Sequence, residues 1–325
     1  MGDKKKIGIG LDLGGTSLKY ALCTLAGEVI KEEKRPSYAE EMPEKIFQNM
    51  AEAIREMQVF AKDNGHTPLV VGLGTPGSVD IERGFLLGST PNFRYWKDIH
   101  IAEVLAQKVD LPIFVDNDAN MMAFAESIFG AGKKAKNTLC LTVGTGIGGG
   151  IIINGRLYRG ARFAGSELGH STIVIDGLAC NCGGNGCLEQ YASATALIRQ
   201  FEIYARDAQI KLDGRHKDVR YIFDLYREQD PLAQRAIDEA IYYLGRGVAS
   251  FINIFNPEIV IIGGGVAEAG SIYIDKVREV ASKYAMKISQ QGVKIVAASL
   301  GNSAGYLGAV AFAFERLKKT GSQTK

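Results

Sequence analysis

Several features that mark common protein classes are scarce in this sequence. Its 325 residues hold 38 Lys and Arg against 36 Asp and Glu, so the basic excess that neutralises nucleic-acid phosphates is missing. No apolar run approaches the roughly 18 residues of a membrane span. The short run after the basic start contains Asp12 and leads into glycines rather than a cleavage site. We therefore expect a cytoplasmic protein that binds neither nucleic acid nor a membrane.

The common nucleotide-binding signatures are also missing. The sequence has no G-x-x-x-x-G-K-[ST], which excludes a Walker-type NTPase. Residues 144–149, "GTGIGG", match G-x-G-x-x-G, but the chain continues as "GIIING", which is strand-like, where a dinucleotide-binding fold requires a helix. Any nucleotide must be held by glycine loops of another kind.

Cysteine is scarce and unevenly distributed. Of five cysteines, Cys23 and Cys140 lie inside apolar, strand-like runs and are interpreted as core residues. The other three fall in one glycine-rich segment that begins with a histidine. One imidazole and three thiolates fill a tetrahedral Zn²⁺ shell, which indicates a structural metal rather than one that activates water. A redox C-x-C pair or idle thiols are the alternatives. The predicted zinc ligands are His170, Cys180, Cys182 and Cys187.

Hydrophobic residues make up 46% of the chain and are patterned as in an α/β protein. Six apolar runs each end in Gly, Asp, Asn or Ser, as buried strands do when their carboxyl ends open into ligand-binding loops. These runs are "KIGIGLDLGGT", "PLVVGLGTPG", "LPIFVDNDAN", "TLCLTVGTGIGGG", "PEIVIIGGG" and "VKIVAASLGN". Spacings of three and four between apolar residues predict a helix over 43–64, and further helices are expected over 242–255 and 304–319. The glycine and alanine content of the last would permit close packing on a sheet.

One unit occurs twice in the chain. A strand, a Gly/Thr loop, a second strand and a turn begin at Leu11 and again at Leu141. Backbone N–H groups of glycine and hydroxyls of threonine suit a polyphosphate, and a carboxylate beside them suits hydrated Mg²⁺. Plain hairpin turns are the alternative. The candidate residues are Asp12, Gly14, Gly15, Thr16, Gly144, Thr145 and Gly146.

Residues 115–120, "VDNDAN", end one predicted strand and begin a helix. Either aspartate could simply cap that helix. Phosphoryl transfer to a sugar needs a group that orients the hydroxyl and accepts its proton, and Asp118 could do this, with Asn117 binding a neighbouring hydroxyl.

Two carboxylates flank the predicted zinc loop. Glu167 precedes it and Glu189 follows it, so a metal would fix both where they could accept hydrogen bonds from sugar hydroxyls. Solvated loop charges are the alternative. The polar loops 72–80 and 88–96 could offer further groups to a polyol.

Taken together, these motifs resemble the ROK family of sugar kinases and related repressors. The resemblance runs from Ile7 to about Leu317. It rests on "DLGGT", "GTPG", "NDAN", "GTGIGGG", "ELGH", "CNCGGNGCLEQ" and "NPEIVIIGGG". It implies a two-lobed, actin-like ATPase fold, a duplicated ribonuclease H-like α/β architecture with a structural zinc loop. The expected lobes are residues 1–120, joined by a C-terminal helix at about 304–320, and residues 121–303.

The resemblance also assigns roles to individual residues. It implies that Asp118 is the catalytic base and that His170 uses one ring nitrogen for zinc and the other for the sugar. Residues implied to bind the sugar are Gly77, Ser78, Thr90, Asn92, Asn117, Asp118, Glu167, His170 and Glu189. The adenosine of ATP is expected near Gly263, Gly264 and Gly265.

The implied function is an ATP-dependent kinase for the 6-hydroxyl of an aldohexose, with glucose favoured and ATP, Mg²⁺ and structural Zn²⁺ required. N-acetylglucosamine, N-acetylmannosamine, fructose and mannose are alternative substrates, and a non-catalytic sugar-sensing regulator is the alternative class. Family repressors carry a helix-turn-helix ahead of the first phosphate loop, where this chain has only about six residues before its first strand, which favours an enzyme. Similar proteins are commonly dimers or tetramers, so we expect a homodimer or homotetramer.

Overall fold

The computed structural model describes residues 6–88, 90, 93–266 and 270–322. The chain divides into two compact units. The first comprises Met1–Lys133, Leu157–Ser166 and Asn302–Lys325, and the second comprises Lys134–Arg156 and Glu167–Gly301. The first unit thus extends past residue 120, the boundary expected from the sequence, which falls inside helix α3.

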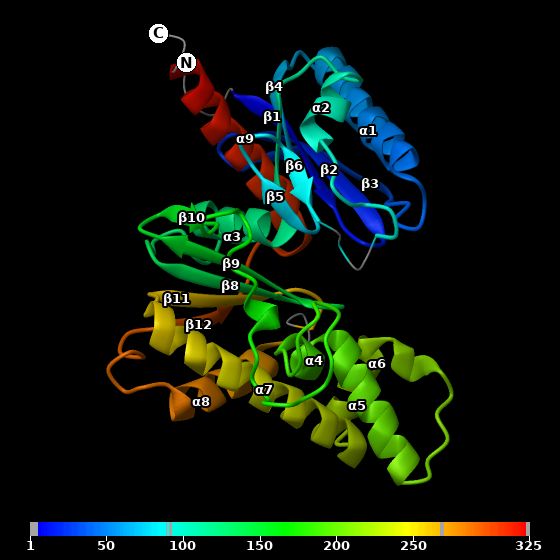
Figure 1. Cartoon of the computed structure of the whole chain (residues 1–325), viewed down its shortest axis with the longest axis vertical. Coiled ribbons are helices and arrows are strands. Elements are labelled where there is room, and N and C mark those ends of the chain that lie inside the picture. Colours follow the sequence, from blue (N-terminus) through cyan, green and yellow to red (C-terminus); the bar gives the residue numbers. More distant parts are fainter. Residues whose placement is uncertain (1–5, 89, 91–92, 267–269, 323–325) are drawn as a thin grey trace. The chain divides into compact units, whose positions relative to one another are not determined.

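A five-stranded sheet in the order β3-β2-β1-β4-β7 forms the centre of the first unit (Figure 1). β1 pairs antiparallel with β2 and parallel with β4, and β4 pairs parallel with β7. The strands are β1 Ile7–Leu13, β2 Ser17–Thr24, β3 Val29–Pro36, β4 Pro68–Thr75 and β7 Ile113–Asn117, with a small hairpin of β5 Ser78–Asp80 and β6 Phe85–Leu87. The helices are α1 Pro43–Asp63, α2 Ile101–Ala106, α3 Asp118–Ile128 and α9 Ala304–Ser322.

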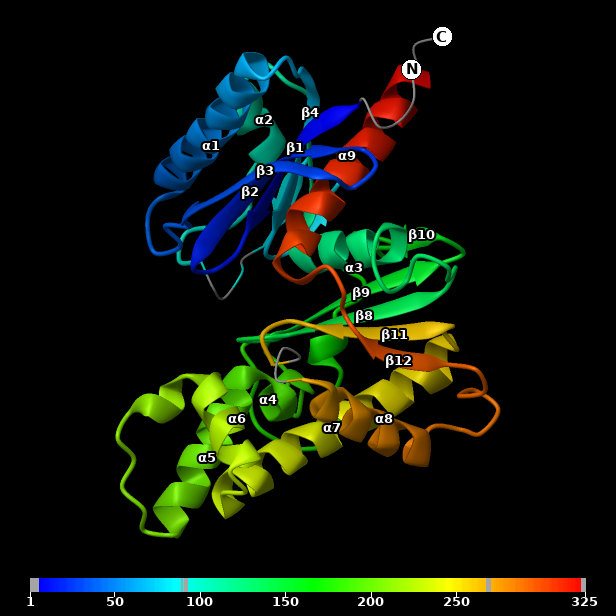
Figure 2. The ribbon, with the colours of Figure 1, turned by 180° about the vertical axis from the view of Figure 1, so that it is seen from behind.

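Glycines decide how α9 packs on this sheet. The odd-numbered residues of β1 share a hydrophobic core with α1, whereas its even-numbered glycines face α9. A Cβ on Gly10 would lie 2.2 Å from the carbonyl oxygen of Tyr306, and one on Gly72 would lie 1.9 Å from that of Ala309. Only a strand without side chains on this face lets the helix backbone approach so closely. The predicted close packing of this helix is confirmed, and Figure 2 shows α9 along the sheet from behind.

The second unit repeats the same order of strands. β9, β8, β11 and β12 are neighbours in that order, with β8 and β9 antiparallel and β11 parallel to both β8 and β12. The strands are β8 Thr138–Val143, β9 Ile147–Ile153, β11 Ile259–Gly263 and β12 Lys294–Ala297, and β10 Arg156–Tyr158 follows β9 after a tight turn. The helices are α4 Glu189–Ala192, α5 Ala194–Asp207, α6 Val219–Arg227, α7 Pro231–Phe255 and α8 Ser271–Tyr284, with short 3-10 turns η2 Leu168–His170, η3 Arg215–Lys217 and η5 Gly301–Ser303, the last of which runs into the first unit.

The six strands and three helices predicted from the sequence are present, although α7 begins at Pro231 rather than at residue 242. The predicted repeat is also present, because β2-β1-β4-β7 and β9-β8-β11-β12 have the same order and directions. In each unit the parallel strands end at one edge of the sheet, where polar loops gather. Within the described part of the chain, no helix has the length and apolar character needed to cross a membrane.

Candidate functional site

The loop between β1 and β2 is a tight turn in which two residues are exposed to solvent. The Gly14 N–H donates to the Ser17 carbonyl at 2.9 Å, which closes the hairpin. From the neighbouring segment, the Ser37 hydroxyl donates to the Gly15 carbonyl at 2.8 Å and the Ser37 N–H to the Thr16 carbonyl at 3.3 Å. Gly15 and Thr16 are themselves exposed, so the N–H and hydroxyl groups of a fixed loop face solvent.

Asp12 lies at the end of β1, against the first turn of α9. A Cβ on Gly305 would lie 2.4 Å from the Asp12 carboxyl carbon, so only glycine leaves room for the carboxylate there. Burial raises the pKa of Asp12, and the charge of Lys19 acts in the opposite direction. Lys19 is held by a 2.7 Å hydrogen bond to the Asn302 side chain, just before α9.

The helix that follows β7 is capped by Asn117 and by neither aspartate. The Asn117 Oδ1 accepts from the Asn120 N–H at 3.0 Å, and its Nδ2 donates to the Gly77 carbonyl at 3.1 Å. Asn117 therefore ties α3 to the loop after β4, and one amide N–H remains for a ligand. Asp118 occupies the first helical position, where its carboxylate accepts from the Ala119 N–H at 2.8 Å.

The structure adds a buried ion pair that the sequence analysis missed. Asp116 is 1% exposed, and its Oδ2 accepts from Nε and Nη2 of Arg159 at 2.7 and 2.6 Å. Burial raises the pKa of Asp116, and the Arg159 charge opposes that rise. The two residues are 43 positions apart, so no local motif could have paired them.

The remaining sugar residues predicted in the first unit lie near the β5–β6 hairpin. Gly77 has φ +93°, and a Cβ there would lie 2.8 Å from Leu86. Ser78 begins β5 and is half-buried, and Thr90 is buried with its Cβ 3.7 Å from the same position. Asn92 lies outside the described residues.

In the second unit, the first residues of α5 donate hydrogen bonds to the loop between β8 and β9. The Gly144 N–H donates to Gly146 at 2.9 Å, the Ala194 N–H donates to Gly144 at 2.8 Å, and the Thr195 hydroxyl donates to Thr145 at 2.8 Å. An antiparallel strand, β9, follows the loop. The expectation that "GTGIGG" is not a dinucleotide-binding fingerprint is therefore confirmed.

Glu189, at the start of α4, contacts the same loop. Its Oε2 accepts from the Ile147 N–H at 2.8 Å, and a Cβ on Gly146 would lie 2.3 Å from this oxygen. Glu189 is thus half-buried and hydrogen-bonded, so the alternative of a solvated loop charge is wrong for this residue.

Glu167 and His170 flank the 3-10 turn η2. A Cβ on Gly169 would lie 2.0 Å from the Ile147 carbonyl oxygen, so this turn packs directly on the start of β9. Glu167 is exposed by surface area, yet the surrounding protein limits its hydration enough to raise its pKa. The charge of Glu189 raises that pKa further, and His170 opposes the rise.

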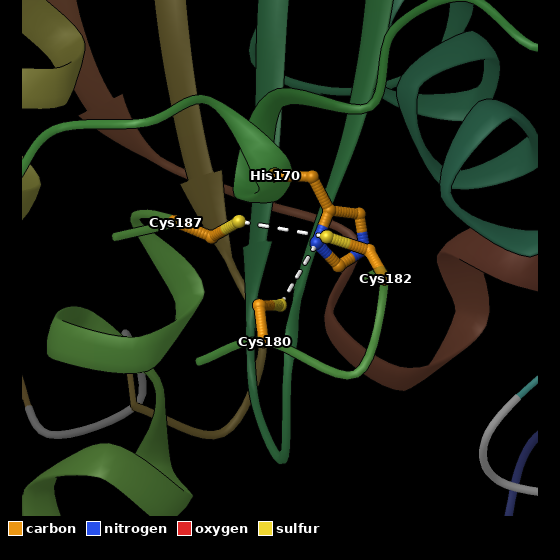
Figure 3. A group of neighbouring side chains, drawn as sticks. All are labelled: His170, Cys180, Cys182 and Cys187. Carbon is orange, nitrogen blue, oxygen red and sulfur yellow. Dashed lines mark hydrogen bonds between the residues drawn. The ribbon is translucent and has the colours of Figure 1, made fainter. Parts of the chain in front are cut away.

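His170, Cys180, Cys182 and Cys187 come together in one group whose candidate ligand atoms all lie within 4.8 Å of one another (Figure 3). The Cys180 Sγ lies 3.5 Å from the His170 Nδ1, and the Cys182 Sγ lies 3.6 Å from the Cys187 Sγ. Tetrahedral zinc at ordinary bond lengths would place two sulfurs about 3.8 Å apart and a sulfur about 3.6 Å from the nitrogen. The four residues therefore have the spacing of a metal site.

The backbone of this loop depends on its glycines. Gly183 has φ +92° and Gly186 has φ +71°, and a Cβ on Gly186 would lie 1.7 Å from the Val174 carbonyl oxygen. Burial raises the pKa of the Cys187 thiol to about 12, whereas a hydrogen bond from the Gly184 N–H lowers that of Cys182.

The glycines after β11 lie over the end of β8. Gly264 has φ +86°, and a Cβ there would lie 2.5 Å from the Val143 carbonyl oxygen, which accepts from the Val266 N–H at 3.0 Å. Apart from its two chain neighbours, no described residue has an atom within 4 Å of a Cβ built on Gly265, so this position is open among the described residues. Gly263 to Gly265 thus adjoin the strand that leads into Gly144.

Comparison with known proteins decides the family. A model of the ROK family matches residues 8–316. The chain belongs to the ROK family. A glucokinase of Thermotoga maritima is 38% identical over 315 residues, which are 95% of this chain and 98% of that protein. The crystal structure of a ROK family glucokinase from Streptomyces griseus, in complex with glucose and AMPPNP, has a TM-score of 0.83, 32% identity, and coverage of 95% of this chain and 99% of that one.

The ROK family also includes regulators. The xylose repressor of Caldicellulosiruptor bescii is 33% identical, with 93% of this chain and 77% of that protein covered. The resemblance predicted from sequence motifs is therefore confirmed for the family and for the sugar kinase fold.

Proposed function

We propose that this ROK protein is an ATP-dependent hexose kinase that transfers phosphate to the 6-hydroxyl of glucose. One observation carries the proposal. Polar side chains, among them the proposed catalytic base, lie at the carboxyl ends of β1, β4 and β7 in a chain that is 38% identical to a glucokinase. Phosphoryl transfer needs little covalent chemistry from a protein, so positioned loops and one carboxylate are sufficient.

The nucleotide would be held by the two repeated loops. Gly15 and Thr16 in the first unit and Thr145 in the second are exposed, so their N–H and hydroxyl groups could face phosphates. Asp12 beside the first loop would help to hold hydrated Mg²⁺, which neutralises charge on the phosphates. Gly265 leaves room for the adenosine next to β8.

The sugar would be oriented by side chains that accept or donate hydrogen bonds. Asp118 would accept the proton of the 6-hydroxyl, and Asn117, Glu167, His170 and Glu189 would bind other hydroxyls, with the loops of Gly77, Ser78, Thr90 and Asn92 completing the pocket. The proposal draws on residues of both units, which we infer to be the lobes of an actin-like kinase, and it requires that water be excluded during phosphoryl transfer.

We also infer that Zn²⁺ binds His170, Cys180, Cys182 and Cys187. Four protein ligands fill a tetrahedral shell, so the metal would be structural and would supply stiffness rather than chemistry. With Nδ1 toward the metal, Nε2 of His170 would be available to a sugar hydroxyl, and the metal would fix that tautomer. The subunit number, two or four by family resemblance, stays a prediction.

A sugar-responsive regulator is the second candidate, because a xylose repressor is among the relatives. The two candidates differ in what ATP does. A kinase consumes it, and a regulator without catalysis does not.

A coupled assay with ATP and glucose, N-acetylglucosamine, N-acetylmannosamine, fructose and mannose tests this proposal. We expect the highest kcat/KM for glucose. Asp118→Asn should bind sugar normally and lose about 10²- to 10⁴-fold in kcat, as expected when a general base is removed. Asp110→Asn, a change of the same kind on an exposed carboxylate of the same unit, should leave kcat unchanged. ATP consumption equal to the blank with every sugar would contradict the proposal and favour the regulator.

A further inference from the structure

The buried pair of Asp116 and Arg159 has no part in the function proposed above, yet it adjoins the proposed base. Both oxygens of Asp116 are used. Oδ1 accepts from the Asn117 N–H at 2.7 Å and from the Asn120 Nδ2 at 3.1 Å, so it fixes the backbone entering α3 and the first turn of that helix. Among the residues that the structure describes, Oδ2 accepts from Arg159 alone. The orientation of the Asp116 carboxylate, and with it the turn that carries Asp118, therefore depends on the arginine.

Arg159 is itself fixed in place. Its side chain is 16% exposed, and its guanidinium lies 5.1 Å from the centre of the Phe312 ring on α9. A planar guanidinium that donates two bonds and stacks on a ring has little freedom to rotate. The anchor of Asp116 is thus part of the packed first unit rather than a mobile surface charge.

The backbone of Arg159 closes a strained loop over residues 158–166. The Gly165 N–H donates to the Arg159 carbonyl at 2.9 Å, and the Ser166 hydroxyl donates to the Tyr158 carbonyl at 3.0 Å. Phe163 and Ser166 have φ of +60° and +72°, which side-chain-bearing residues adopt only when their surroundings impose it. This loop leads directly to Glu167, the first proposed sugar ligand of the second unit.

We propose that Arg159 is a positioning residue for phosphoryl transfer. Its side chain orients Asp118 through Asp116, and its backbone closes the loop that presents Glu167. Arg159 touches neither reacting atom, and its effect is on the geometry of groups that do. The inference rests on the proposed kinase function.

Removal of the arginine alone would be ambiguous, because it leaves a buried carboxylate without its counter-charge and could destabilise the whole unit. The double variant Arg159→Met, Asp116→Asn removes both charges together. If the pair serves only to neutralise charge, the double variant recovers stability and turnover. If it positions Asp118, stability recovers and turnover does not.

The experiment measures kcat, both KM values and urea unfolding for Arg159→Met, Arg159→Lys and the double variant. A displacement of about 1 Å in a reacting group can cost about 100-fold, so we expect the double variant to lose about 10- to 100-fold in kcat while its midpoint of unfolding returns toward that of the wild type. The KM for ATP should be little changed. Arg159→Lys, which keeps the charge without the planar fork, should fall between the wild type and the double variant in kcat.

Arg35→Met is the matched control. Arg35 also donates to buried or half-buried partners in the first unit, Tyr20, Glu52 and Glu56, but these belong to β2 and α1. It should lower stability and leave kcat unchanged. Wild-type kcat in the double variant, or an equal loss of kcat in Arg35→Met, would overturn the inference.

Failure of this inference is distinct from failure of the proposed function. If Asp118→Asn is inactive and the double variant is fully active, the kinase assignment stands and the positioning role is wrong. If Asp118→Asn keeps full turnover, the base assignment is wrong whatever the arginine variants do. Hydrogen exchange of the amides of residues 117–120 provides a readout without substrate, and it should accelerate in the double variant but not in Arg35→Met.

Discussion

The two units use the same order of strands but support their loops in different ways. In the first, α9 lies directly on the glycines of β1 and β4, and Gly305 makes room for Asp12 at the end of β1. In the second, the segment after β10 carries the His and Cys group, and Glu189 holds the β8–β9 loop through the Ile147 N–H. Within the described residues, a group of His, Cys and acidic side chains with metal-like spacing occurs only in the second unit.

The difference follows from what each loop can bury. The first loop adjoins a long helix and a hydrophobic core, so packing alone can fix it. The segment from Thr172 to Cys187 buries little apolar surface, because two of its four larger hydrophobic residues, Ile175 and Leu178, are 87% and 45% exposed and the other two are only half-buried. A segment of this composition gains little from burial to offset its loss of conformational entropy, and the proposed Zn²⁺ would supply the missing free energy. The two equivalent loops must both be fixed by neighbouring structure, but the surrounding sequence decides whether packing or a metal fixes them.

Removing a metal ligand should have the largest effect in this comparison. In Cys182→Ser the bound zinc should fall from one per chain to near zero, and kcat/KM should fall by at least about 100-fold, because the loop that carries Glu167 and His170 loses its support. Elemental analysis of the purified protein and the coupled assay measure both quantities.

Cys23→Ala is the control, because it removes a buried thiol that belongs to the first unit. Burial raises the pKa of this thiol to about 12. Its metal content should equal that of the wild type. Zinc-free wild-type protein with full activity would refute the role given to the metal, and so would equal zinc in Cys182→Ser.

Breaking the support of the first unit should cost stability instead. Gly72→Ala places a Cβ 1.9 Å from the Ala309 carbonyl oxygen, which belongs to a helix backbone that cannot rotate away. We expect a loss of about 3 kcal/mol in the free energy of unfolding, at the upper end for overpacking, measured by urea denaturation.

Gly144→Ala is the matched change in the second unit, because a Cβ there would lie within 4 Å of no atom of the described residues beyond its chain neighbours. Its free energy of unfolding should stay within about 0.5 kcal/mol of the wild type, as is usual for open positions. If Gly72→Ala proves as stable as Gly144→Ala, helix packing is not what fixes the first loop.

The sequence predicted the repeated fold because periodicity and glycine placement are local signals. "KIGIGLDLGG" alternates large and absent side chains, and the structure gives each set its own face of β1. The four metal-site residues were also found, because three cysteines and a histidine in one short segment are rare enough to indicate a metal.

The Asp116–Arg159 pair was missed because its partners are distant in sequence and each has an ordinary local interpretation, an aspartate before a helix and a surface arginine. The cap of α3 was ambiguous for a similar reason, since Asp116, Asn117 and Asp118 are all good caps and only backbone geometry selects Asn117.

The smallest expected change in the free energy of unfolding concerns the hydrogen bonds that each unit donates to an exposed glutamate. In the first unit, Arg316 on α9 donates to both oxygens of Glu82 at 2.7 Å, and this hydrogen bonding lowers the pKa of Glu82. In the second unit, backbone N–H groups of Asn137 and Lys136 lower the pKa of Glu258. Because Glu82 is 60% exposed, Glu82→Gln should cost only about 0.5 kcal/mol at pH 7.

The pH dependence of that cost has a definite sign. Since the folded pKa of Glu82 is below the unfolded value of about 4.3, the stabilisation is complete above that value and is lost as the pH falls through the folded pKa. Wild type and Glu82→Gln should therefore converge in urea unfolding at low pH. Added salt should reduce the difference at pH 7, because a side-chain ion pair is screened.

Glu315→Gln, which removes an exposed pair with Lys319 one turn along the same helix, should cost less, about 0.3 kcal/mol. A difference between wild type and Glu82→Gln that grew toward acidic pH would show that the arginine does not stabilise the ionised glutamate.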